Sequence, residues 1–278
     1  MPFCQNCGAA LPDSQARYCP RCGAPVLSAS ARMEPDQHTF IVELRPKINI
    51  KVSTPGSVTV ASGQDGQVSI TADITEKGNI DYRASQEGNR IDIAARTKTW
   101  DPLIWGSYVF SGGPRVNIRL TAPKDADLYV ETATDSISIN AINGAITCES
   151  KTGNVRLMNC AGTISLHTHT GIVDLENVNG LIDVRDTIGM VNFSGSLAAG
   201  PNSVRTTTGD INIAFKGPQD LLIDANTVVG HIISRVDLAE SKYDRGQYVG
   251  QHISGRLGSG KGRLILDATT GSISLVSA

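Results

Sequence analysis

Aromatic residues are scarce in this chain of 278 residues, because phenylalanine, tryptophan and tyrosine together make up only 5% of it. Large rings therefore cannot dominate the core, which must be built from smaller apolar side chains. An excess of charge of either sign is lacking too, since the formal net charge is −2. This balance argues against a general affinity for nucleic acid through neutralisation of phosphates.

Long apolar runs are also missing. No stretch approaches the roughly 20 consecutive apolar residues that cross a bilayer, and the start of the chain, MPFCQNCGAALPDSQARYCPRCG, lacks the basic-then-apolar pattern of a secretion signal. We therefore expect a cytoplasmic protein. Glycine, by contrast, is abundant, with 28 residues, which suits a protein of short strands and many tight corners.

Four of the six cysteines lie in two CxxC pairs near the start of the chain. Two such knuckles supply the four thiolates of a tetrahedral Zn²⁺ site, and with four sulfur ligands the metal has no open position for catalysis. A redox dithiol or an iron centre is the alternative, but a redox CxxC normally occurs in a βαβ context, which this sequence lacks. The predicted ligands of a structural zinc ion are Cys4, Cys7, Cys19 and Cys22.

Residues 3–25 resemble the short N-terminal zinc-ribbon domain of bacterial and archaeal proteins of mixed function. The resemblance implies a module that the metal holds together and that often makes contacts with other molecules. We delimit this domain as residues 1–26. A small, polar, proline-containing linker follows at 27–38, and residues 39–278 form the second domain.

Glycine recurs every nine residues through the middle of the second domain. Apolar residues follow each glycine two and four positions later, as Val155 and Leu157 follow Gly153, and residues two apart point to the same face of a strand. Corners of similar sequence return at every second glycine, so the full period is 18. The glycines are Gly144, Gly153, Gly162, Gly171, Gly180 and Gly189, with Asp135 in the preceding position.

Two strands and two corners in each period predict a parallel β-solenoid with about 18–21 residues per coil. Residues 18 apart should then lie one strand spacing apart, roughly 4.8 Å. An antiparallel meander or sandwich is the rival fold, but recurrence of one corner type at every second turn favours coils over hairpins. The predicted inward ladders are Ile137–Val155–Val173–Val191–Ile211–Ile273, Ile139–Leu157–Leu175–Phe193–Ile213, Ile146–Ile164–Ile182 and Cys148–Leu166–Val184.

Three segments depart from this rhythm. Residues 39–130 alternate like strands without the nine-residue interval, and we assign them to the less regular start or cap of the β-body, before the repeat coils at 131–278. The aromatic segment TWDPLIWGSYVFSGG, 99–113, is either a loop over an open end or a contact patch. The stretch at 234–254 interrupts a coil and is interpreted as a side loop.

Residues 40–278 also resemble the bacterial putative-adhesin family of β-strand-repeat domains, whose function is unknown. The resemblance rests on APKDADLYVETATDSISI at 122–139, SKTGNVRL at 150–157, TTTGDINI at 206–213 and TTGSISL at 269–275. It implies a parallel β-helix-like fold and no established catalytic residues.

We predict no catalytic residues. Outward positions such as Arg156 and Asp174 form surface ladders of opposite charge, and the pattern gives no reason for two carboxylates to meet as in sugar-cleaving enzymes. His167 and His169 are either a metal pair or solvated strand residues, and without a predicted third ligand we favour the second reading. Cys148 is interpreted as a small buried hydrophobe, and so is Cys160.

GRLGSGKG at 255–262 matches the GxxxxGK of a phosphate-binding loop, but Gly262 stands where such loops have Ser or Thr. A strand pattern follows instead of the helix that phosphate binding requires. We therefore predict a simple turn into the last coil.

The sequence as a whole predicts a non-enzymatic cytoplasmic scaffold or protein-interaction module with structural zinc and no other cofactor. The expected partner is an unidentified protein or a second copy, and neither nucleic acid nor a membrane span is expected. A self-assembling β-helical filament is the alternative, because the chain stops at SISLVSA without a capping helix. A carbohydrate-active β-helix enzyme is the least favoured possibility.

Overall fold

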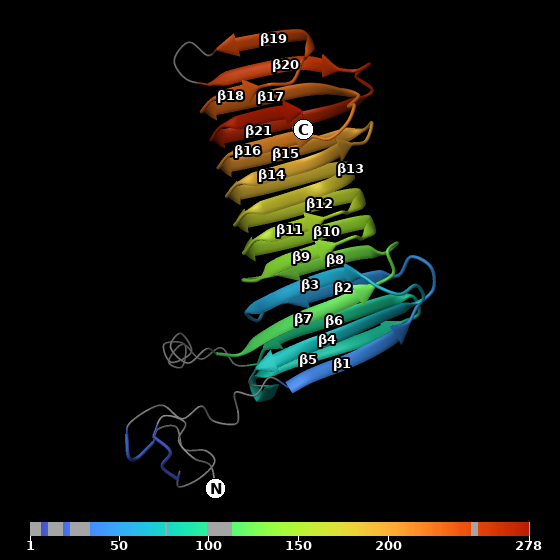
Figure 1. Ribbon diagram of the computed structural model, residues 1–278, viewed down its shortest axis with the longest axis vertical. Coiled ribbons are helices and arrows are strands. Elements are labelled where there is room, and N and C mark those ends of the chain that lie inside the picture. Colours follow the sequence, from blue (N-terminus) through green and yellow to red (C-terminus); the bar gives the residue numbers. More distant parts are fainter. Residues whose placement is uncertain are drawn as a thin grey trace.

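The computed structural model describes residues 7–10, 19–22, 34–75, 77–98, 113–245 and 250–277. In these residues the protein is all-β, with one short 3-10 helix at Lys77–Asn79 and no α-helix. The strands form one tall stack (Figure 1), and the described strands belong to a single mixed sheet. No helix within the described ranges is long and apolar enough to span a membrane.

The stack has two faces, each made of strands that pair in a continuous row. Face A contains, in spatial order, β5 (Ile80–Glu87), β6 (Arg90–Thr97), β2 (Lys47–Val52), β8 (Asp127–Thr132), β10 (Asn143–Thr152), β12 (Ala161–Thr170), the second half of β13 (Val173–Ile188), β15 (Pro201–Thr208), β21 (Gly262–Thr270), β17 (Leu221–Val229), β20 (Gln251–Leu257) and β19 (Ala239–Arg245). Face B contains β1 (Glu34–Ile41), β4 (Gln67–Thr75), β7 (Arg115–Ala122), β3 (Gly56–Ser62), β9 (Ser136–Asn140), β11 (Val155–Met158), the first half of β13, β14 (Val191–Leu197), β16 (Ile211–Phe215), β22 (Ile273–Ser277) and β18 (Ile232–Ser234).

The predicted register is confirmed in the centre of the stack. Val155 pairs in parallel with Ile137 on one side and Val173 on the other, each 18 residues away. On face A, Ile164 pairs in the same way with Ile146 and Ile182. The inward side chains of these ladders are almost completely buried, so neighbouring coils share one apolar interior. The rival antiparallel meander is therefore wrong for this region.

The corner glycines stack on one another because there is no room for a side chain. A Cβ added to Gly171 would lie 2.1 Å from the carbonyl oxygen of Gly153, and one added to Gly153 would lie 2.1 Å from that of Asp135. Gly171 also has a φ of 150°, which side chains disfavour. The glycine interval thus records the close approach of successive corners, and Asp135 occupies the first corner position as predicted.

A parallel solenoid throughout is too simple a description, because the sheet is mixed. At one end β4 runs antiparallel to both β1 and β7, and β5 runs antiparallel to β6. At the other end β20 runs antiparallel to β17 and β19. The segment 234–254 was expected to be a side loop, but it contains β19 and the first residues of β20, and these two antiparallel strands extend face A.

Two pairs of strands lie between strands that are distant from them in the sequence. One of these insertions shows that the expectation of an open end at the last strand is wrong. β2 and β3 lie between β6–β7 and β8–β9, while β21 and β22 lie between β15–β16 and β17–β18. The segment SISLVSA was expected to leave an open end, but β22 pairs with β16 on one side and β18 on the other. The last strand of the chain is thus internal to the sheet.

Partly buried apolar side chains pack against the core near both ends. Phe40 of β1 and Tyr82 of β5 do so at the first end, and Val236 and Leu238 do so at the last. His38 stacks on Phe40 with ring centroids 5.9 Å apart. The ends of the stack are therefore covered by the chain itself.

The aromatic segment 99–113 lies outside the described residues except for Gly113, so its role stays a prediction. The domain boundaries at 26 and 38 also stay predictions, although β1 begins at Glu34, inside the segment that was assigned to the linker.

Candidate metal centre and surface groove

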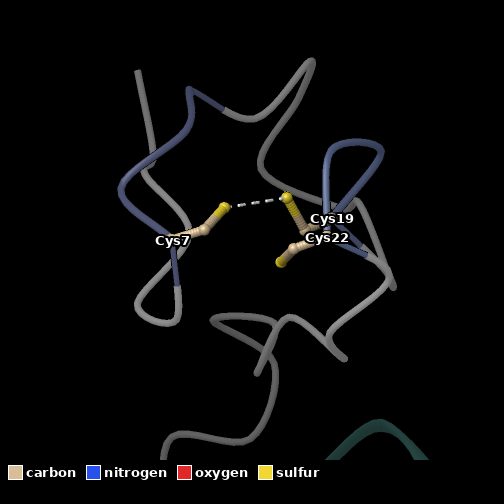
Figure 2. Close-up of side chains that lie close together, drawn as sticks. All are labelled: Cys7, Cys19 and Cys22. Atoms are coloured by element: carbon tan, nitrogen blue, oxygen red, sulfur yellow. Dashed lines mark hydrogen bonds between the residues drawn. The ribbon is translucent and has the colours of Figure 1, made fainter.

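Three of the four predicted zinc ligands lie together (Figure 2). The sulfur atoms of Cys7, Cys19 and Cys22 are all within 4.8 Å of one another, and the Sγ atoms of Cys7 and Cys19 are 3.6 Å apart. The second cysteine of the first CxxC pair thus lies beside both cysteines of the second pair, as the spacing predicted. Cys4 lies outside the described residues, so its role as the fourth ligand stays a prediction.

The sulfur geometry fits a zinc ion. Two thiolates on one tetrahedral Zn²⁺, each about 2.3 Å from the metal, are about 3.8 Å apart, whereas a disulfide would hold them at about 2.05 Å. Gly8, directly after Cys7, has a φ of 69°, so the glycine permits the sharp turn that the motif requires. Cys7, Cys19 and Cys22 would hold the ion, which would cross-link the two knuckles.

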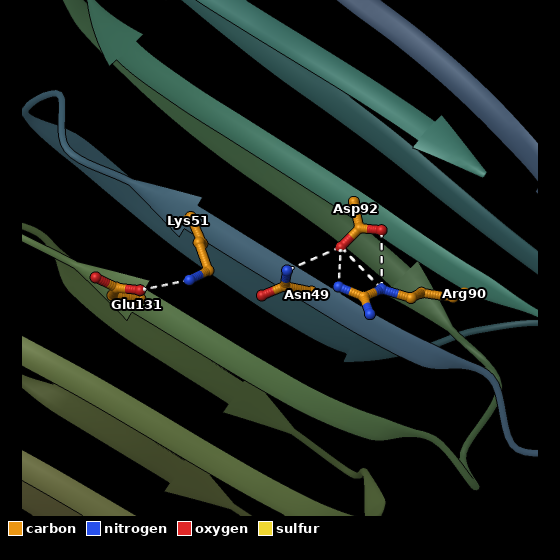
Figure 3. Close-up of polar contacts among 5 residues, drawn as sticks. All are labelled: Asn49, Lys51, Arg90, Asp92 and Glu131. Carbon is orange, nitrogen blue, oxygen red and sulfur yellow. Dashed lines mark hydrogen bonds and ion pairs between the residues drawn. The ribbon is translucent and has the colours of Figure 1, made fainter. Parts of the chain in front are cut away.

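The outer surface of face A carries a polar network on β6, β2 and β8 (Figure 3). Arg90 donates to both carboxylate oxygens of Asp92, with distances of 2.8–3.1 Å, and Asn49 donates to the same carboxylate at 2.8 Å. The hydrogen bonds from Arg90 are the main cause of a lowered pKa for Asp92, which burial opposes. One strand further on, Lys51 forms an ion pair of 3.1 Å with Glu131.

Tyr129 links two carboxylates beside this network. Its hydroxyl donates to Glu131 at 3.2 Å, and the ammonium group of Lys51 lies 5.3 Å from its ring centroid. Burial, together with the charges of Glu131 and Glu149, raises the pKa of Tyr129 to about 12, so the phenol stays protonated. Glu131 and Glu149 are register neighbours on β8 and β10; the sequence analysis missed this pair because β8 precedes the glycine rhythm.

A groove of about 520 Å³ crosses β6, β2, β8, β10 and β12 on face A. Ser53 and Ala133 occupy its middle, and they follow directly on the paired residues Val52 and Thr132. Their side chains are short, whereas the corresponding outward positions on the flanking strands carry long ones. The groove is therefore a gap in a row of side chains, bounded by Arg96, Lys151 and His169.

His167 and His169 both line this groove and are exposed. Neither forms a hydrogen bond or an ion pair with the described part of the chain. The described residues contain no cluster of three potential metal ligands that includes either histidine. Both are exposed residues of β12, and the preference for solvated residues over a metal pair stays a prediction.

The other outward ladders also agree with the predicted register. Arg156 lies beside Asp174 and Asp174 beside Asn192 on face B, and Asn192 donates to Asp174 at 2.7 Å. Glu149, His167 and Arg185 form the corresponding row on face A. Ion pairs form within these surfaces, such as Arg156 with Glu176 at 3.1 Å.

Within the segment 255–262, residues 258–261 form the predicted turn, and the rest belongs to β20 and β21. The turn connects these two strands, which lie on opposite sides of β17, so the chain must cross the start of β17. The carboxylate of Asp220 accepts hydrogen bonds there from the Ser259 hydroxyl at 2.8 Å and the Lys261 amide at 3.1 Å. These hydrogen bonds lower the pKa of Asp220. The segment that matches the phosphate-loop pattern is thus a turn whose hydrogen-bond donors are used by the carboxylate of Asp220.

The core contains a polar ladder that the sequence analysis did not identify. Thr132, Ser150, Thr168, Asp186 and Thr206 are successive register neighbours on face A, and each is at most 6% exposed. Their short hydroxyls fit the narrow space beside the corner. Burial raises the pKa of Asp186.

Cys148 and Cys160 are fully buried, so their interpretation as small core residues is confirmed. Burial raises the pKa of both thiols. Both therefore remain protonated and poorly nucleophilic.

Several solved bacterial proteins of low sequence identity match the structure with TM-scores below 0.5. A putative adhesin from Bacteroides fragilis has 12% identity and a TM-score of 0.44, with 88% of this chain and 99% of that chain covered. A putative cell adhesion protein from Clostridium sporogenes has 10% identity and a TM-score of 0.35, with 88% and 100% covered. A putative lipid binding protein from Parabacteroides distasonis has 13% identity and a TM-score of 0.30, with 87% and 96% covered.

Among curated proteins, none matches this chain. One family model does match, and it covers residues 3–26, the segment that contains both CxxC pairs. The N-terminal segment of the chain is a zinc-ribbon domain.

Proposed function

We propose that the protein is a non-enzymatic, cytoplasmic protein-interaction module, in which a zinc-held ribbon precedes a rigid β-solenoid. The observation that carries the proposal is the long central stack of paired coils. Such a stack presents broad outward faces, and its rigidity comes from a buried interior shared by all the coils. The ribbon would add a second surface, held by Cys4, Cys7, Cys19 and Cys22.

The chemistry of the groove favours binding over catalysis. A carboxylic acid that protonates a leaving group is usually kept neutral by burial. Glu131 has a side chain that is 45% exposed and forms an ion pair with Lys51. It therefore lacks the apolar, enclosed environment that a glycosidase gives its acid.

Growth of a filament is disfavoured by the strands at the ends. Of the described strands, β1, β5, β18 and β19 each pair with one other strand alone. β19 carries Glu240 and Lys242, β1 carries Pro35, and β5 carries Asp81, whereas β18 is only 3 residues long. Charges, proline and very short length on edge strands all oppose pairing with another chain. We therefore favour a discrete particle over the filament alternative.

The test is reconstitution of a complex from purified components. The tagged full-length chain is cross-linked in lysate, the captured protein is identified by mass spectrometry, and both proteins are then purified and mixed. A defined stoichiometric complex in light scattering supports the proposal. Absence of any reconstituted complex, or conversion of a carbohydrate substrate by the chain alone, would contradict it. Sedimentation of the chain by itself should show no polymers.

A further inference from the structure

We propose that the groove on face A binds an acidic peptide segment of a partner protein. This inference rests on the proposed function and specifies the surface and the chemistry of the partner. Basic side chains gather around this hollow, where Lys51, Arg96 and Lys151 lie with Glu131 and Glu149, in a protein whose net charge is −2.

The basic end of the groove is formed by three side chains on two adjacent strands. Lys151 of β10 and His169 of β12 immediately follow the paired residues Ser150 and Thr168, and both point outward. His167 lies two positions before His169 on the same face of β12. None of the three forms a hydrogen bond or an ion pair within the described residues, so their donors are available to a ligand.

The carboxylates in the groove are already engaged by neighbours. Glu131 forms its ion pair with Lys51 at 3.1 Å, and the Tyr129 hydroxyl, which bonds to Glu131, is also hydrogen-bonded with Glu149. Glu131 is therefore paired with a cation, whereas Glu149 has a hydrogen bond to a neutral phenol. Three cations, Lys51, Arg96 and Lys151, line the groove against these two carboxylates. A ligand with negative charge thus gains a net attraction.

The opposite end of the groove provides a second cation. Arg96 of β6 has only a long ion pair of 3.8 Å with Asp81. Three strand spacings separate β6 from β10, which corresponds to about 14 Å between the two backbones. An extended peptide covers this distance in about four residues at roughly 3.3 Å each. Acidic residues four positions apart would therefore reach Arg96 and Lys151 together.

The floor between these cations suits a peptide backbone. Ser53 offers a hydroxyl, and Ala133 leaves the space that an approaching main chain needs. Among the described residues, no phenylalanine, tryptophan or tyrosine lines the groove, and single-stranded nucleic acids depend on aromatic stacking for much of their affinity. The partner is thus an acidic peptide rather than a polynucleotide.

The experiment is a fluorescence-anisotropy titration of the full-length protein at low salt. The probe is a fluorescein-labelled ten-residue peptide with glutamates at positions 3 and 7, and its control has glutamines there. Lys151→Glu is compared with Lys216→Glu, which makes the same charge change in an exposed turn outside the groove. Thermal melts establish that both variants are folded.

We expect binding of the glutamate peptide alone, weakened at least about fivefold by Lys151→Glu and nearly unchanged by Lys216→Glu. Arg96→Gln should weaken the glutamate peptide as well. Equal binding of both peptides, equal effects of both lysine variants, no binding at millimolar peptide, or a preference for a sulfated polysaccharide would each overturn the inference. If the reconstituted partner binds Lys151→Glu normally, the groove proposal fails while the proposed function stands.

Discussion

The hydroxyl of Thr168 donates a hydrogen bond of 2.6 Å to Oδ1 of Asp186, the residue beside it in the next coil. The other carboxylate oxygen, Oδ2, is buried and has no hydrogen-bond partner among the described residues, and the same holds for the hydroxyl of Thr206 on the following coil. One carboxylate thus interrupts a buried row of hydroxyls. Its environment favours the protonated form, and burial is the main cause of the raised pKa.

Replacement of this carboxylate should stabilise the protein at alkaline pH. Because the pKa of Asp186 is raised by folding, its favourable contribution is present at low pH and is lost as the pH rises through the folded value. Asp186→Thr, which continues the hydroxyl ladder, should raise the free energy of unfolding by about 1 kcal/mol at pH 8 and change it little at pH 4. Urea denaturation at both pH values measures this. A variant that is less stable at pH 8 would contradict the prediction.

The central register could be predicted because it depends on short-range spacing. Each glycine and the apolar residues after it repeat within one coil, so Val155 and Val173 could be matched without any other information. The polar ladder was not recognised because Ser150 and Thr168 look like ordinary corner residues in the sequence. Their burial follows from the width of the coil beside the corner, which no local pattern reports.

The ends of the sheet could not be predicted, because their strand pairings connect distant parts of the chain without a repeated interval. Ile211 and Ile273 were matched by their corner motifs although 62 positions separate them. The insertion of β2 between β6 and β8 has no such signal, and neither do the antiparallel partners of β4. The proximity of Cys7, Cys19 and Cys22, by contrast, could be predicted from the CxxC spacing alone.

Asp135 provides a second pH-dependent test at a different corner. It is 1% exposed, accepts a hydrogen bond from the amide of Gly56, and leaves its other oxygen without a partner in the described ranges. Burial raises its pKa to about 6, although Arg115 and the Gly56 amide oppose the shift. The stability that protonated Asp135 contributes is therefore present below about pH 4 and is lost as the pH rises through about 6.

Asp135→Asn keeps an acceptor for Gly56 and removes the buried charge. We expect a gain in unfolding free energy at pH 7.5 of up to about 3 kcal/mol, the equivalent of roughly two pKa units, and almost none at pH 4. Arg115→Gln should have the opposite effect at pH 7.5, because it removes a neighbouring positive charge. The expectation fails if the benefit of Asp135→Asn is the same at both pH values.

Replacement by alanine should cost more stability at a glycine stacked against the next coil than at a glycine that needs only a positive φ. Gly171→Ala would place its Cβ 2.1 Å from the Gly153 carbonyl oxygen, so the coils must move apart; we expect a loss of at least about 3 kcal/mol. Gly217 has a φ of 71° and nothing within 4 Å of an added Cβ. Gly217→Ala should therefore cost only about 1 kcal/mol.

Thermal and urea unfolding of the two glycine variants measure this difference. Gly78→Ala serves as a third comparison, since its added Cβ meets nothing within 4 Å and no positive φ is involved. Equal losses for Gly171→Ala and Gly217→Ala would mean that close approach of the corners does not limit the stack.

Asn202 is a buried polar residue in an otherwise apolar position. It lies beside Leu264 in the register and is 2% exposed. Its Oδ1 accepts from the Ile182 amide at 3.0 Å, and its Nδ2 donates to the carbonyl of Ala198 and two others at 3.1–3.3 Å. The side chain thus satisfies backbone groups where the corner at 198–200 is irregular.

Asn202→Leu should destabilise the protein even though it makes the ladder more apolar. It leaves the Ile182 amide and several carbonyls without their partner, at about 1–3 kcal/mol for each buried group that water cannot reach. Val204→Leu at the next inward position of β15 adds apolar volume without removing a hydrogen bond, and overpacking should cost about 1–3 kcal/mol. Urea denaturation compares the two. A stabilising effect of Asn202→Leu would show that the amide is dispensable.

The zinc ribbon and the sheet should respond independently to loss of their own cysteines. Full-length protein is expected to bind one zinc ion per chain through four thiolates, and Cys19→Ser should abolish stoichiometric binding, since a hydroxyl is a poor ligand for zinc. Metal analysis after dialysis measures this. The main thermal transition should stay unchanged, because it reports the apolar core of the stack.

Cys148→Ser is the matched control: it buries a hydroxyl in an apolar ladder, so it should lower that transition by several degrees and leave the zinc content intact. Retention of zinc by Cys19→Ser, or its loss in Cys148→Ser, would contradict the assignment of the zinc ligands.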